Sequence, residues 1–110
     1  MEYQFIEQDT KMGKKITVTS TRTDSNTKWY WQSDDAANNP AWQQREQFLQ
    51  QHPSIIFQPT MTEYTLTVVI EIHDEEVYNQ FIASSESVTP GVLAYCDANG
   101  ISYNAVTEDI

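Results

Sequence analysis

The sequence predicts a single α+β domain in which an antiparallel sheet is covered on one face by helices. Three observations lead to this prediction. The chain has 110 residues, close to the commonest length of one domain. Residues 63–73 alternate between apolar and other side chains, as half-buried strands do. Two other stretches place apolar residues at helical spacing behind residues that cap helices. We therefore expect one domain over residues 1–110.

The chain opens with two stretches that favour β structure, Glu2–Glu7 and Lys15–Arg22, separated by a polar turn that contains Gly13. In the second stretch Ile16 and Val18 alternate with threonines, the period of two expected of a strand with one buried face. We predict a hairpin. After the polar loop 24–26, the aromatic cluster 29–31 is expected to be a strand end or a loop folded onto the core.

The first helix is predicted to begin at Pro40, behind the capping residue Asn39, and to run to about Gln51. Pro53 ends it, because the residue before a proline resists helical backbone angles. One face of this helix is apolar, with two basic side chains near its centre. The residues of that face are Ala41, Trp42, Arg45, Phe48, Leu49 and His52.

The middle of the chain is predicted to form two further strands. Ser54–Gln58 is expected to be a strand, Pro59–Thr62 a turn, and Glu63–His73 the clearest strand in the chain. A slip of one residue in the last strand would expose its whole apolar face, so its register is strongly specified. The side chains expected to face the core are Tyr64, Leu66, Val68, Ile70 and Ile72.

The last part of the chain is predicted to contain two helices and a closing strand. Asp74 caps the first of these helices, which buries Val77, Tyr78, Phe81, Ile82 and Ser85. We expect a break at residues 86–88 and a new helix from residues 89 and 90. Asn99 and Gly100 end that helix, because glycine tolerates left-handed backbone angles, and Ile101–Val106 is the closing strand.

After the opening strand, the predicted order is strand, helix, strand, strand, helix, strand. This is the split βαβ pattern of ferredoxin-like folds, with an antiparallel sheet and helices on one face. The other face would carry mostly uncharged polar side chains: Thr17, Thr19, Thr65, Thr67 and Val69. Such a face is too uncharged for a free surface, so we expect a homodimer that pairs sheet to sheet.

Two segments carry a resemblance to a known superfamily. They are Thr67-Val-Val-Ile-Glu-Ile-His-Asp-Glu-Glu-Val-Tyr-Asn-Gln-Phe-Ile and Leu93-Ala-Tyr-Cys-Asp-Ala-Asn-Gly-Ile. Together they resemble the second half of the dimeric α+β barrel superfamily. The resemblance covers roughly half the chain, in element order and patterning. It implies a ferredoxin-like fold, a homodimer and a small apolar molecule held between sheet and helices; some members are monooxygenases that need no cofactor.

The charge distribution excludes several kinds of partner. The formal net charge is −10, and all six Lys and Arg residues lie in the first 45 positions. From Glu63 onward there are nine acidic residues and no Lys or Arg. This surface would repel phosphate groups, so we expect no nucleic-acid partner and no membrane partner. The acidity itself fits solubility or a salty cytoplasm, or a protein that occupies a basic partner.

The sequence also predicts where the protein resides and what it lacks. No apolar run could span a bilayer and no signal peptide is apparent, so we expect a cytoplasmic protein. Cys96 is the sole cysteine and is expected to be a packed thiol without a disulfide. The two histidines, His52 and His73, have no spacing typical of a metal site. We therefore expect no metal and no cofactor.

Arg45 is the most informative candidate residue, because a guanidinium on an apolar helix face needs an anionic partner. One interpretation is that Arg45 reaches solvent or pairs with a carboxylate such as Glu71. The other is that it anchors the acid head of a fatty-acid-like or aromatic ligand between sheet and helices. The residues predicted to bind this ligand are Trp42, Arg45, Phe48, Leu49, Tyr64, Leu66 and Phe81.

Two further functions stay open at this point. The first is an enzyme resembling the cofactor-independent monooxygenases, or an isomerase, in which His73 or Tyr64 would handle protons in the same cleft. The second is a module whose acidic second half faces a basic protein. No residue is identified as catalytic, and whether the protein is an enzyme is left undecided.

Overall fold

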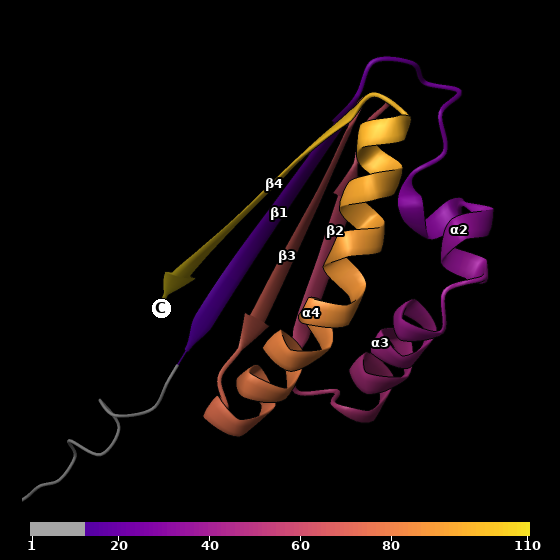
Figure 1. The fold of residues 1–110 in the computed structure, drawn as a ribbon. Helices are drawn as coiled ribbons and strands as arrows, with labels where there is room; N and C mark the ends of the chain where they lie inside the picture. The colour runs from indigo at the N-terminus through magenta and orange to yellow at the C-terminus, as the bar shows by residue number, and fades with distance from the viewer. Residues whose placement is uncertain (1–12) are drawn as a thin grey trace, which may run out of the picture.

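The computed structural model describes residues 13–110 as a four-stranded antiparallel sheet with helices packed against it (Figure 1). The strands are β1 (Lys14–Arg22), β2 (Ile56–Met61), β3 (Thr65–Ile72) and β4 (Ile101–Asp109). They lie in the order β2-β3-β1-β4, and each neighbouring pair is antiparallel. This confirms the predicted α+β class and is compatible with a ferredoxin-like arrangement. The predicted strand Glu2–Glu7 lies outside the described residues.

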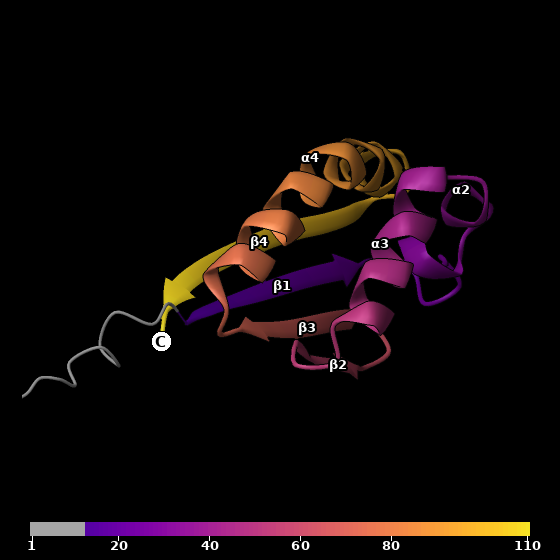
Figure 2. The same ribbon diagram turned by 90° about the horizontal axis from the view of Figure 1, so that it is seen from below.

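Two long helices, α3 (Pro40–Gln51) and α4 (Glu75–Ala98), lie on the same face of the sheet (Figure 2). The predicted caps are present at both N-termini. The Asn39 side chain accepts a hydrogen bond from the backbone N–H of Ala41, and Asp74 accepts one from that of Val77. Both helix starts are therefore where the sequence predicts them.

The predicted break in α4 at residues 86–88 is wrong, because the helix continues through Pro90 to Ala98. Its buried side chains Phe81, Val88 and Cys96 are spaced by about two turns each and form one stripe against the sheet. Pro90 itself is exposed. Packing of a continuous stripe thus outweighs the local preference of proline to interrupt a helix.

The predicted turn at Pro59–Thr62 is also wrong. Pro59 belongs to β2, opposite Val68 of β3, and the turn follows at residues 62–64. β2 is an edge strand that pairs on one side only. A proline fits there, because its missing N–H need not face a neighbouring strand.

The aromatic cluster 29–31 forms neither a strand end nor a plain loop. Tyr30–Gln32 is a 3-10 helix, η1, followed by the short helix α2 (Asp34–Ala37), which the sequence analysis does not predict. Trp29 is 1% exposed, whereas Trp31 is 50% exposed. Ser33 caps α2 by accepting from the N–H of Ala36. A helix of four residues is too short to produce a recognisable apolar period.

The closing strand follows a helix end of the predicted kind. Gly100 has a φ of 69°, in the left-handed region that glycine tolerates. β4 then extends to Asp109, three residues beyond the predicted end at Val106. With this extension β4 pairs along the whole of β1, and Lys14 forms an ion pair with Asp109 at its end.

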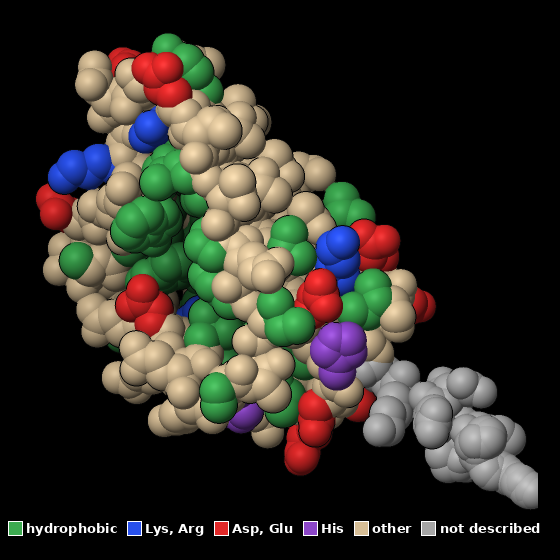
Figure 3. All heavy atoms as spheres, turned by 180° about the vertical axis from the view of Figure 1, so that it is seen from behind, with side chains coloured by type: hydrophobic (Ala, Val, Ile, Leu, Met, Phe, Trp, Pro, Cys, Tyr) green, Lys and Arg blue, Asp and Glu red, His purple; other side chains and the backbone are tan. Residues whose placement is uncertain are grey.

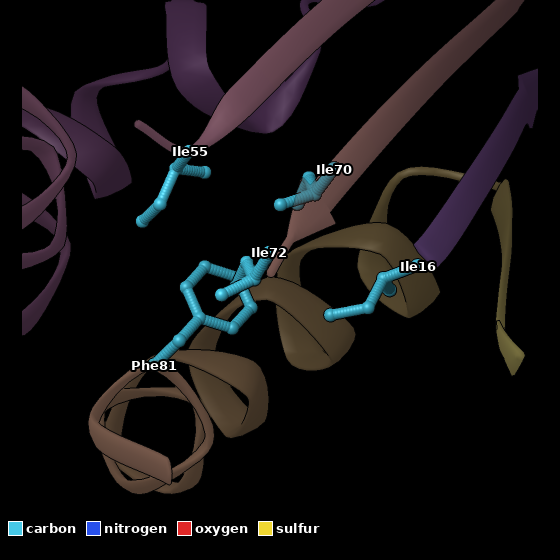
Figure 4. Close-up of a cluster of buried hydrophobic side chains, with 5 residues drawn as sticks. All are labelled: Ile16, Ile55, Ile70, Ile72 and Phe81. Carbon is cyan, nitrogen blue, oxygen red and sulfur yellow. The ribbon is translucent and has the colours of Figure 1, made fainter. Parts of the chain in front are cut away.

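The interior between sheet and helices contains two separate apolar clusters. The first, shown in Figure 4, is built from Ile16, Ile55, Ile70, Ile72 and Phe81. The second is built from Trp29, Cys96 and Ile101. Val18 and Val68 pack against the first cluster, and Leu66 and Tyr103 pack against the second. The core of the domain therefore consists of two parts that follow one another along the strands.

The face of the sheet opposite the helices carries mainly uncharged polar side chains. Thr17 lies opposite Val69, and Thr19 lies opposite Thr67, all on the face away from Ile16 and Ile70. Figure 3 views the molecule from behind and shows mainly polar, uncharged side chains and backbone over this part of the surface. Within residues 13–110, no helix combines the length and the apolar character needed to cross a bilayer.

Candidate functional site

Arg45 extends from α3 to α4 and binds two consecutive serines there. Its Nε donates to Ser84 Oγ at 2.9 Å, and its Nη2 donates to Ser85 Oγ. The guanidinium carbon also lies 4.0 Å from the centroid of the Phe81 ring, a cation–π arrangement. Arg45 therefore joins the two helices in the interior of the domain.

The two serines are oriented to accept hydrogen bonds from Arg45. Their hydroxyl groups donate to the backbone carbonyl of Phe81, Ser84 at 2.7 Å and Ser85 at 3.1 Å. Each hydroxyl has one hydrogen to donate, so its oxygen is left to accept from the guanidinium. Such local bonding to the preceding turn is common for serine in helices.

Arg45 has no carboxylate partner among residues 13–110. The ion pairs of that region are Lys14–Asp109 and His73–Glu71. Glu71, considered as a partner from the sequence, lies 3.5 Å from His73, on the sheet face away from Ile70 and Ile72. The guanidinium is thus held by neutral oxygens and an aromatic ring.

Burial lowers the pKa of Arg45 to about 10, and Tyr103 opposes this effect. Burial also raises the pKa of Tyr103, and Arg45 opposes that shift. The two side chains are therefore close enough for each to affect the ionisation of the other. A lowered pKa is what a cation shows when it leaves water without meeting an anion.

A layer of polar side chains separates the two apolar clusters. On α4, Ser84 and Ser85 lie between Phe81 of the first cluster and Cys96 of the second. On β1, Ser20 follows Val18 on the core face and is 7% exposed. We call the following set the polar layer: Ser20, Arg45, Ser84, Ser85 and Tyr103. In a small domain such a layer replaces apolar packing, which suggests a purpose other than stability.

An apolar groove lies beside this layer, along β2. Phe57 and Met61 pair with Ile70 and Leu66, so they point to the helix-covered face. They are nevertheless 47% and 52% exposed, because the helices leave this edge of the sheet uncovered. Figure 3 shows a hollow beside the sheet that is lined by hydrophobic side chains and has a Lys or Arg within it. We call this feature the β2 groove.

The structure brings four of the seven predicted ligand-binding residues together. Phe48, Leu49 and Phe81 pack in or against the first cluster, and Arg45 lies over Phe81. The Phe48 and Phe81 ring centroids are 6.4 Å apart. Phe48, Leu49 and Phe81 thus form an apolar wall of the first cluster, and Arg45 contacts this wall through Phe81.

The other three predicted ligand-binding residues lie apart from that wall. Trp42 packs edge-on against Tyr30, with ring centroids 5.0 Å apart. Leu66 packs against the second cluster. Tyr64 lies in the turn before β3 and is 45% exposed.

Sequence reasoning missed Ser84, Ser85 and Tyr103, as well as the groove residues Phe57 and Met61. Ser84 and Ser85 follow Phe81 by three and four positions, which places them on the same side of α4. That spacing is the feature of the sequence that could have placed both serines beside Phe81. Met61 was missed because Pro59–Thr62 was interpreted as a turn, whereas Phe57 lay in the predicted strand Ser54–Gln58 but was not assigned to a site.

The histidines and the cysteine belong to no metal-binding cluster within the described part of the chain. His52 stacks on Phe48 and its Nδ1 lies 2.9 Å from the Phe48 carbonyl oxygen. Residues 13–110 contain no group of three His, Cys, Asp or Glu side chains arranged to hold a metal. Burial raises the pKa of the Cys96 thiol, which is 5% exposed. An inert packed thiol fits that environment.

Two open depressions lie on the surface near α2. One is lined mainly by Tyr30, Asn39, Gly91 and Tyr95, and the other mainly by Lys28, Asp34 and Asn99. Neither is lined by Arg45 or by the groove residues. Comparison with protein-family models, with curated proteins and with solved structures gave no match for this chain.

Proposed function

We propose that the protein binds an apolar small molecule with an acidic head, such as a fatty acid or an aromatic acid. The tail would lie in the β2 groove, and Arg45 would orient the head. One observation carries the proposal: a half-buried guanidinium whose partners among residues 13–110 are two serine hydroxyls and the Phe81 ring. A buried cation without an anion costs free energy that an anionic ligand would recover.

The exposed apolar side chains of β2 support the same proposal. Phe57 and Met61 face the helix side of the sheet, yet about half of each is in contact with solvent. A ligand tail that covered them would gain roughly 25 cal/mol for each Å² of apolar surface removed from water. The groove and the cation thus supply the two parts of an amphipathic binding site.

Binding can be tested with decanoate. Native mass spectrometry should detect a co-purified ligand, and decanoate should raise the melting temperature of the protein. Arg45→Gln should reduce that rise, whereas Lys28→Gln, which also removes one positive charge but at an exposed position, should not. If no ligand co-purifies and fatty acids leave the melting temperature unchanged, the proposal is wrong.

We also propose a ferredoxin-like homodimer in which two sheets pair through their open faces, as the resemblance to dimeric α+β barrels implies. The strand order β2-β3-β1-β4 and the uncharged composition of the open face support this proposal. Isologous pairing would cover Val69 and Val106, the second of which is 50% exposed.

The dimer can be tested by light scattering during size-exclusion chromatography. Val69→Glu, in the middle of the open face, should produce monomers because it buries a charge at the pairing surface. Ile82→Glu, on an exposed position of α4, should leave the dimer intact. A protein that is monomeric at high concentration before any substitution would contradict this proposal.

A further inference from the structure

Arg45 leaves one edge of its guanidinium without a partner among the described residues. An arginine carries five N–H groups: one on Nε and two on each Nη. Ser84 accepts from Nε and Ser85 from Nη2, so both serines occupy the same side edge of the group. The end edge, formed by Nη1 and the second hydrogen of Nη2, makes no hydrogen bond within residues 13–110. This edge is a preformed pair of parallel donors.

Tyr103 carries a neutral hydroxyl group that interacts electrostatically with Arg45. Ser20 and Tyr103 lie opposite each other on β1 and β4, on the sheet face that the helices cover. Neither hydroxyl makes a hydrogen bond to a side chain or backbone group of residues 13–110. Tyr103 and Arg45 affect each other's ionisation, so the Tyr103 hydroxyl lies within electrostatic reach of the guanidinium. The polar layer therefore holds one positive charge and two hydroxyls, of Ser20 and Tyr103, that make no hydrogen bond within residues 13–110.

This composition selects the charge and the shape of an anion. One guanidinium neutralises one negative charge, and a second negative charge in the layer would be left uncompensated. Two parallel N–H donors match the two oxygens of a planar carboxylate. A phosphate could also accept from these two donors, but a dianionic phosphate would bring a second negative charge that nothing in the layer compensates.

We propose that the polar layer is a carboxylate subsite. The end edge of the Arg45 guanidinium would bind the carboxylate of a monoanionic ligand, with the Tyr103 hydroxyl as an additional donor. Ser84 and Ser85 would be positioning residues, because they hold the side edge of Arg45 and turn its end edge outward. This inference rests on the proposed ligand-binding function and specifies its head group.

The subsite can be tested by isothermal titration calorimetry with three ligands that share one tail: decanoate, decanol and decyl phosphate. At slightly alkaline pH, where decyl phosphate is a dianion, we expect decanoate to bind at least about tenfold more tightly than either of the others. Tyr103→Phe should weaken decanoate binding by about fivefold and leave decanol unchanged.

Variants of the serines separate positioning from tail binding. The double variant Ser84→Ala, Ser85→Ala should lose most of the preference for decanoate and keep the affinity for decanol. Ser87→Ala, an exposed serine on the same helix, is the matched control and should keep the preference. Arg45→Lys retains the charge without the paired donors, so it should also lose most of the preference. Circular dichroism would check that each variant is folded.

The outcomes distinguish this inference from the proposed function. Equal affinities of the unsubstituted protein for decanoate and decanol would overturn the carboxylate subsite and leave tail binding in the groove intact. Tighter binding of decyl phosphate would overturn the head-group class. If the serine double variant keeps the full preference for decanoate, the positioning role is wrong. If none of the three ligands binds, the proposed function itself fails.

Discussion

Replacing Pro90 by alanine should stabilise the protein, because Pro90 lies inside the continuous helix α4. Proline cannot donate the hydrogen bond that the carbonyl of Glu86, four residues earlier, would accept, and its ring crowds that carbonyl. Pro90 is exposed, so alanine would remove no core contact. The substitution therefore isolates the backbone cost of the proline.

The size of the effect follows from two opposing terms. A proline in a helix interior costs about 3 kcal/mol relative to alanine. Proline also restricts the unfolded chain, which favours folding by up to about 1 kcal/mol that alanine would lose. The net gain is about 2 kcal/mol. With an unfolding entropy of roughly 2.1 cal/mol/K per residue, a chain of 110 residues should melt about 9 °C higher.

Urea unfolding followed by circular dichroism would measure this gain. Pro40→Ala is the control, because Pro40 occupies the first position of α3, where its missing N–H has no partner to lose. It should lower stability by up to about 1 kcal/mol. If Pro90→Ala leaves stability unchanged or lowers it, the helix is interrupted at this position, as the local sequence predicts.

Three further predictions concern the core. Phe81→Ala should lower the free energy of unfolding in urea by about 3–5 kcal/mol, because Phe81 is 3% exposed, whereas Phe57→Ala at a 47% exposed position should cost much less. Burial raises the pKa of Tyr103, so the folded state keeps a proton that the unfolded state loses as the pH rises above about 10. The contribution of Tyr103 to stability should fall with pH over that window, whereas that of Arg45, whose pKa is lowered, should rise. Tyr103→Phe should therefore remove the falling contribution; a pH profile that this substitution leaves unchanged would contradict the burial of Tyr103. Cys96 should react slowly with a thiol reagent in the native protein and rapidly in urea, since it is buried and its pKa is raised; equal rates would contradict its packing.

The elements that the sequence predicts correctly are those specified by several signals at once. α3 has a capping asparagine, a proline at its first position and an apolar face, and all three point to the same boundary. β3 has strict alternation over most of its length, and the structure shows it as a strand over Thr65–Ile72. At these places local preference and tertiary packing agree.

The secondary-structure predictions are wrong at two prolines. Each was interpreted as a turn or a helix break, but its neighbours in the fold allow a proline within a strand or a helix. Pro59 lies in an edge strand, and Pro90 lies on the exposed side of a helix whose other side is buried. Proline is tolerated at both places for reasons that depend on neighbours, which a single sequence does not display. The candidate site was predictable in part for the same reason. Arg45 was identified from its helix face, but its partners Ser84 and Ser85 are 39 and 40 residues away.

The position of Arg45 fits the proposed binding function, because its charge is partly buried without a clear gain in stability. Burial lowers its pKa to about 10, which corresponds to about 3 kcal/mol against the charged form. Because the side chain keeps some contact with solvent, we take about half of that value. Its two hydrogen bonds to the serines and its contact with Phe81, at roughly 0.5 kcal/mol each, recover about 1.5 kcal/mol, so the two contributions nearly cancel.

Arg45→Met should therefore leave the stability of the ligand-free protein unchanged or raise it slightly, by up to about 1 kcal/mol. A methionine of similar length would fill the gap between the two apolar clusters and restore a continuous core. The same variant should lose the stabilisation by decanoate, which a melting curve with and without the ligand would measure. A loss of 2 kcal/mol or more in the ligand-free state would instead mean that Arg45 is a structural link between α3 and α4, because only then would its bonds to α4 outweigh the cost of its burial.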